Sequence, residues 1–184
     1  MKRLLDSILA DPRYLEGIEW GDPRPGHGEG AIKNHIADLK WNLELLDRED
    51  YVTSDQEDKL LILIHVHDTF KKWSVEQCPI VHPQSHASLA TQFLKRKGVQ
   101  DKDILTICQY HDEWWAIYNR QKRKGMDERC QTRLNALIER VDDWQLYVLF
   151  AVIDSCTPHK GMEAILWFLT EVGADAEMVD LCIG

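Results

Sequence analysis

Residues 61–71 read LILIHVHDTFK, a stretch that is apolar on most sides and then ends on a histidine and an aspartate side by side. Together with the preceding DQEDKL, it has the pattern of a helix that is buried around most of its circumference. An imidazole and a carboxylate at the end of such a helix are costly to desolvate unless they have partners. The sequence therefore predicts a central helix over residues 55–68 that delivers His67 and Asp68 into the interior.

The rest of the chain also has helical periodicity, and it contains no β-alternation of useful length. Helix caps and turn residues divide it: Ser85 can cap a helix that ends near Gly98, and another helix begins near Asp101 or Asp103. Other helices are indicated over 1–14, 32–46, 143–154 and 161–173, whereas the predicted connections are 18–30, 78–85 and the basic stretch 119–127. The 184 residues are therefore expected to form one all-α domain of seven or eight helices.

Composition narrows the class of protein. The net charge is −9, which argues against a large nucleic-acid-binding surface but not against a small basic pocket for a phosphate group. The five cysteines form no C-x-x-C pair, so neither a disulfide framework nor a thiolate zinc site is expected, and a reducing, cytoplasmic compartment is the simplest interpretation. No apolar stretch approaches the ~20 residues of a membrane span, and the N-terminus is interpreted as a helix, not a signal peptide.

Ligand-type residues interrupt the inward faces of several predicted helices. His35 lies between Ile32 and Leu39 at helical spacing, and similar spacing places the other members of the set inward. A single inward histidine is more often a hydrogen-bonded core residue than a ligand, and His65 fits that description. Six buried ligand-type residues in one small domain are better compensated by a shared metal site. The candidate ligands are His35, His67, Asp68, His86, His111 and Asp154.

The ordered set His35, His67-Asp68, His86, His111 and Asp154 resembles the HD-domain superfamily of metal-dependent phosphohydrolases, from residue 27 to residue 154. HGEGAIKNH (27–35) is similar to the H-P-E-G loop of the HD domains in bacterial CCA-adding tRNA nucleotidyltransferases, with Gly28 where Pro is usual. HDTFK (67–71) is similar to H-D-x-x-K, with Phe70 where Gly is common, and SHASLA (85–90) and QYHDE (109–113) match the segments that follow. The nucleotidyltransferase catalytic domain has no counterpart in this chain.

The resemblance implies a site for two divalent ions. One ion would be held by His35, His67, Asp68 and Asp154, and the other by His86, His111 and a bridging Asp68. His82, four residues before His86, is the alternative ligand and would otherwise lie near the mouth of the site as a substrate contact. Nitrogen and oxygen ligands without thiolates suit Fe, Mn, Ni, Zn or Mg, with a preference for transition metals where imidazole dominates.

Further residues near these ligands are candidates for catalysis and binding. Asp68 would orient the attacking water, and Lys71 either contacts a phosphate oxygen or is a solvated lysine at the helix end. Glu29 and His27 precede the first ligand and can orient it, transfer a proton or contact substrate, although the alternative is a plain flexible loop.

An aromatic and basic stretch, HDEWWAIYNRQKRK (111–124), follows the last histidine ligand. Trp114 or Trp115 could stack a base, and Arg120 could hold a phosphate; alternatively one tryptophan is core and the rest is a solvated turn. The expected function is hydrolysis of a phosphate ester on a nucleotide or RNA end. A nucleotide-sensing module without turnover and a di-iron oxygenase are the alternatives.

Overall fold

The computed structural model describes residues 1–24, 28–158 and 160–183. Within these ranges the chain forms eleven α-helices, the short 3-10 helix η1 (Lys71–Trp73) and no β-strand. The predicted all-α class is therefore confirmed, although the helices outnumber the seven or eight expected. None of the helices in the described ranges is long and apolar enough to cross a membrane.

Some of the additional helices are short, and others lie in segments whose charged composition had indicated a connection. The N-terminal segment divides into α1 (Lys2–Leu9) and α2 (Pro12–Ile18), because the Asp11 carboxylate accepts a hydrogen bond from the Arg13 amide and Pro12 occupies the first helical position. Most of the basic stretch predicted as a connection belongs to α7 (Glu113–Lys124), since Lys and Arg are good helix formers. The last helix, α11 (Glu177–Ile183), has only seven residues.

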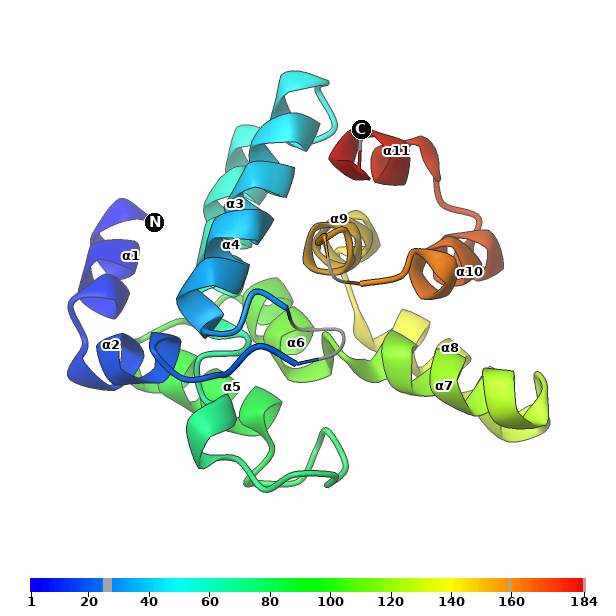
Figure 1. Cartoon of the computed structure of the whole chain (residues 1–184), viewed down its shortest axis with the longest axis horizontal. Coiled ribbons are helices and arrows are strands. Elements are labelled where there is room, and N and C mark those ends of the chain that lie inside the picture. Colours follow the sequence, from blue (N-terminus) through cyan, green and yellow to red (C-terminus); the bar gives the residue numbers. More distant parts are fainter. Residues whose placement is uncertain (25–27, 159, 184) are drawn as a thin grey trace.

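Two helices buried around most of their surface form the centre of the molecule. α4 (Ser54–Val66) begins at a capping box between Thr53 and Gln56, and it packs beside α3 (Ile32–Arg48). α9 (Trp144–Ser155) is buried along almost its whole length and contacts both α3 and α4. α10 (Glu163–Val172) lies on the other side of α9, and α11 contacts both α3 and α9 (Figure 1).

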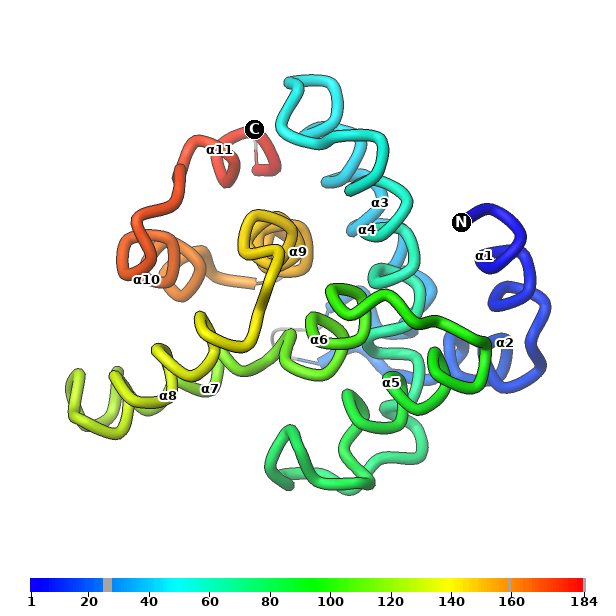
Figure 2. Tube along the Cα trace, turned by 180° about the vertical axis from the view of Figure 1, so that it is seen from behind, coloured from blue at the N-terminus to red at the C-terminus, as the bar shows by residue number. Residues whose placement is uncertain are grey.

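Two helix pairs complete the fold. α5 (His86–Arg96) packs on α6 (Lys102–Tyr110), and α6 also contacts α4. α7 and α8 (Glu128–Arg140) form a hairpin that extends away from the main body, on the side opposite α1 and α2 (Figure 2). This arrangement brings the C-terminal ends of α4, α6 and α9 together with the first turns of α3 and α5.

Candidate metal centre and adjoining cleft

The end of α4 holds the central pair of the site. His67 is the residue at which α4 ends, Asp68 lies in the following turn, and both are buried. The turn is fixed from two sides: the Thr69 hydroxyl donates to the His65 carbonyl at 2.6 Å, and Gly17 of α2 packs directly against Thr69. A Cβ at position 17 would lie 2.2 Å from the Thr69 carbonyl oxygen, so only glycine fits here without displacing the turn.

His35, His67 and Asp68 form the first ligand triad, with one ligand atom from each lying within 4.8 Å of the others. Asp154, near the end of α9, joins them: its Oδ1 is 2.8 Å from His35 Nε2 and 3.5 Å from His67 Nε2. Two imidazoles and two carboxylates from three helices therefore converge on one buried point.

Asp68, His86 and His111 form the second triad, again within 4.8 Å of one another. Asp68 Oδ1 lies 3.6 Å from His86 Nε2 and 3.7 Å from His111 Nε2, and the two Nε2 atoms are 3.1 Å apart. Asp112 adds a carboxylate, because its Oδ2 is 3.2 Å from His86 Nε2 and 3.6 Å from His111 Nε2. Asp68 is the one residue that the two triads share.

The tautomers of two histidines suit metal ligation. His67 Nδ1 donates to the Leu63 carbonyl at 3.0 Å and His111 Nδ1 donates to the Cys108 carbonyl at 2.9 Å. In the neutral imidazole this places the lone pair on Nε2, the atom that faces Asp68 in both residues. His67 Nε2 and Asp68 Oδ1 are buried and have no hydrogen-bond partner among the residues that the structure describes. A divalent cation would satisfy both atoms, so the donor set fits the metal site that the sequence predicts.

His35 needs a change of tautomer to fit the same scheme. Its Nε2 donates to Asp154, and its buried Nδ1, which has no hydrogen-bond partner, lies 3.7 Å from Glu29 Oε1. If the proton moved to Nδ1, the Glu29 carboxylate could accept a hydrogen bond from Nδ1–H, and the lone pair of Nε2 would be free to bind a metal ion. Glu29 is thus placed to orient the first histidine of the site.

The charges of the cluster favour a bound cation. Burial alone would raise the pKa of Asp68, but Lys71 and the surrounding histidines hold it well below its usual range. The pKa of Asp154 is lowered in the same way, against the effect of burial, by Lys160 and His35. Burial opposes protonation of His111, yet Asp112, Asp68 and Asp154 together raise its pKa to about 9. Negative charge that retains a proton on a buried imidazole would also stabilise a metal ion.

His82 and His86, the two alternative ligands, have different surroundings in the structure. His86 is the first residue of α5 and contributes to the second triad, whereas His82 lies in the loop, where its Nδ1 accepts from the Gln84 amide at 3.2 Å. Lys71 forms an ion pair with Asp68 and lines the adjoining cleft, so it is not a solvated lysine. His27, by contrast, lies outside the described residues.

The residues of the aromatic and basic stretch lie on different faces of α7 and therefore have different surroundings. Trp114 is only 4% exposed and packs on Phe168 with ring centroids 5.3 Å apart, so its predicted role in substrate binding is corrected to a core role. Trp115, one residue and about 100° further around the helix, is 45% exposed and lines the cleft. Arg120 forms an ion pair with Asp127 and lines a second, neighbouring cavity instead of the cleft.

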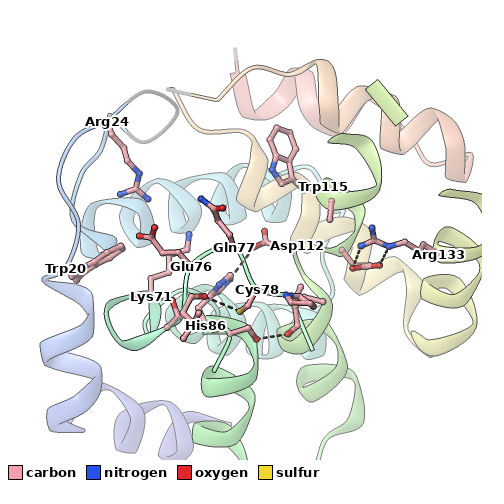
Figure 3. Close-up of a pocket in the computed structure, with 17 residues that line it drawn as sticks. Trp20, Arg24, Lys71, Glu76, Gln77, Cys78, His86, Asp112, Trp115 and Arg133 are labelled. Carbon is pink, nitrogen blue, oxygen red and sulfur yellow. Dashed lines mark hydrogen bonds and ion pairs between the residues drawn. The ribbon is translucent and has the colours of Figure 1, made fainter. Parts of the chain in front are cut away.

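A cleft of about 490 Å³ opens beside the second triad. Figure 3 shows Trp20 and Arg24 on one side and Trp115 on the other, with Lys71, His86 and Asp112 between them. A planar group entering the cleft would meet aromatic side chains, and an anionic group would meet Lys71 and Arg24 next to the ligands. The volume suits a small organic ligand.

Several functional candidates had not been identified from the sequence. Asp112 repeats the His-Asp dipeptide of 67–68, so a signal was present, whereas Lys160 lies six residues beyond Asp154 in a segment without a motif. Trp20, Arg24 and Arg133 reach the cleft from distant segments and carry no local pattern. Comparisons with protein-family models, curated protein sequences and solved structures gave no match, so the function is inferred from the site itself.

Proposed function

We propose that this protein is a metal-dependent phosphohydrolase of the HD type that removes or opens a phosphate ester on a nucleotide or a nucleic-acid end. The observation that carries the proposal is the buried carboxylate of Asp68, which faces two separate pairs of histidines. Sites in which two divalent ions share a carboxylate ligand suit the displacement of an oxygen at phosphorus.

The residues that would hold the two ions are the first triad with Asp154 and the second triad with Asp112. Divalent cations bound there would stabilise the charge on the attacking and leaving oxygens and would promote ionisation of water at neutral pH. The protein's own residues position the substrate. Lys71 and Arg24 line the cleft next to the ligands and would bind the non-reacting phosphate oxygens, and Trp20 and Trp115 would contact the base.

The five cysteines within the chain are free thiols. We include a reducing compartment, the cytoplasm, in the proposal, because exposed or half-buried thiols such as Cys78 and Cys182 persist where the environment is reducing.

The test is hydrolysis by protein reconstituted in turn with Mn²⁺, Fe²⁺, Ni²⁺, Zn²⁺ and Mg²⁺. The panel contains nucleoside monophosphates, 2′,3′-cyclic nucleotides, a generic phosphomonoester and a generic phosphodiester. We expect metal-dependent release of phosphate or opening of the cyclic ester, and loss of activity in Asp68→Ala. Lys71→Ala should lower activity while the metal stays bound.

Failure of every metal form on the whole panel would contradict the proposal. Binding of nucleotides without turnover would favour a sensor, and consumption of O₂ by the iron form would favour an oxygenase. Nucleotide binding without turnover and O₂ consumption therefore distinguish the sensor and the oxygenase from the hydrolase.

A further inference from the structure

A second cavity, of about 990 Å³, adjoins the cleft along the α7–α8 hairpin. We call it the basic trough. Six cationic side chains line it, and none of its lining residues is acidic, although the chain as a whole carries a net charge of −9. The six are Arg120, Lys122, Arg123, Lys124, Arg129 and Arg133.

Half of these cations are already neutralised from outside the trough. Arg120 pairs with Asp127, Lys122 with Glu163, and Arg133 with Glu113 through two bonds of 2.7 and 2.8 Å. Those pairs fix the side chains that form the walls.

The other half lack such partners. Lys124 and Arg129 are exposed, and no acidic side chain pairs with either of them within the described part of the chain. Arg123 is also exposed, and within residues 1–24, 28–158 and 160–183 its side chain donates only to the Asn119 carbonyl of its own helix. A solvated helical surface normally mixes charges of both signs, whereas this one keeps an excess of positive charge on one side of a cavity.

The trough is continuous with the cleft. Gln77, Cys78, Trp115, Ala116 and Arg133 line both cavities. Trp115 therefore stands where the two meet, 45% exposed and stacked against Tyr118 at 27° between ring planes. A ligand that leaves the cleft past Trp115 enters a passage lined by unpaired cations.

We infer that the basic trough binds the phosphodiester backbone of a short single strand of nucleic acid whose terminal phosphate occupies the cleft. This inference rests on the proposed function and narrows its substrate class from a nucleotide or a nucleic-acid end to the end of a short single strand. An exposed aromatic ring beside cations is the arrangement that holds unpaired bases, which a duplex keeps stacked. Three unpaired cations match only a few phosphates, in agreement with the acidic character of the rest of the chain.

The test compares binding and turnover of a mononucleotide with a 3′-phosphate and of a pentanucleotide with the same 3′-terminal residue. The protein is the full chain loaded with metal, and binding is measured with the Lys71→Ala variant, which should keep the metal, if turnover by the wild type is too fast. We expect the pentanucleotide to bind at least tenfold more tightly than the mononucleotide, with affinity that falls as the salt concentration rises.

Lys124→Ala/Arg129→Ala is the informative variant, because both side chains are exposed and the described part of the chain holds no acidic partner that would be left behind. It should abolish most of the advantage of the pentanucleotide and leave the mononucleotide unchanged. For a single strand, each neutralised phosphate contributes about 0.7 to the salt slope, so two lost contacts should reduce the slope by about 1.4. Lys2→Ala/Arg3→Ala removes the same charge from α1, which lies on the opposite side of the molecule (Figure 1), and should change neither value.

Three results would overturn the inference. They are equal affinity for both lengths, an unchanged salt slope in Lys124→Ala/Arg129→Ala, and equally tight binding of a pentaglutamate peptide, which would make the trough a general anion site. The proposed function fails separately: length-dependent binding without hydrolysis refutes the hydrolase and supports the trough, whereas hydrolysis that ignores chain length does the reverse.

Discussion

Asp68 belongs to both ligand triads, and this sharing makes a quantitative prediction about metal content. Replacing His35 should remove the ion of the first triad, and replacing His86 should remove that of the second. Replacing Asp68 should remove both. Elemental analysis of protein dialysed against Mn²⁺ or Ni²⁺ should therefore give about two equivalents for the wild type, one for His35→Ala or His86→Ala, and none for Asp68→Ala.

The increase in Tm on adding metal measures how much each bound ion stabilises the fold. An ion present at a hundred times its dissociation constant stabilises the folded state by about 2.7 kcal/mol, so two sites contribute about 5.4 kcal/mol and one site half of that. For a domain of this size 1 kcal/mol corresponds to about 2–4 °C in Tm, so loading both sites should raise Tm by about 11–22 °C. The single-histidine variants should show about half of the shift, measured by calorimetry with and without metal.

Two controls separate ligation from damage to the fold. Asp68→Ala leaves Lys71 as an uncompensated charge, so Asp68→Ala/Lys71→Ala is the better-matched variant because it removes the ion pair as a whole. His82→Ala changes a neighbouring loop histidine that is outside both triads and should keep two ions. If the Asp68/Lys71 variant still bound two ions with the full thermal shift, the assignment of Asp68 as the shared ligand would be refuted.

Four further substitutions probe the site and its surroundings. Trp115→Ala should lower the affinity for base-bearing substrates by about 1–3 kcal/mol, measured by titration, and leave base-free phosphates unaffected. Trp114→Ala, a core truncation, should instead cost about 3–5 kcal/mol of stability in chemical denaturation. Gly17→Ala should destabilise the fold by about 1–3 kcal/mol and weaken metal binding, since the new methyl group meets Thr69, whereas Gly161→Ala meets nothing and should be neutral. Burial raises the pKa of Tyr14 to about 12, so unfolding should become easier as the pH rises from 10 toward 12, and Tyr14→Phe should lose that component of the pH dependence; an identical slope in the two proteins would refute it.

The central helix could be predicted because its pattern is local. An apolar run that follows DQEDKL and ends on His-Asp leaves few alternatives, and the structure has α4 within two residues of the predicted range. Helical spacing also placed His35, His111 and Asp154 on inward faces. What spacing could not supply was the distance between helices, which depends on how α3, α6 and α9 pack around α4.

The predictions were wrong in two places: the face of α7 on which a tryptophan lies, and the basic stretch that was expected to be a connection. Trp114 and Trp115 are adjacent, so a shift of about 100° on the same helix separates a core residue from a residue of the cleft. The charge of the run of basic residues after them predicts a connection, but long basic side chains favour a helix when one face can remain in water. The cleft itself combines residues from four distant segments, and no local pattern identifies such a set.

The two His-Asp dipeptides explain why a helix end is a good place for a ligand. His67 and His111 are each the residue at which a helix ends, and each donates Nδ1–H to a carbonyl of the turn that precedes it. The last carbonyls of a helix carry partial negative charge, so they orient the imidazole and favour a cation nearby. The Leu63 carbonyl accepts the His67 imidazole in addition to the His67 backbone amide, at 3.0 Å from each. In both cases Nε2 is thereby directed to the same carboxylate, Asp68. The partial negative charge is confined to the last turn of a helix, and the position of the dipeptide is therefore as informative as its composition.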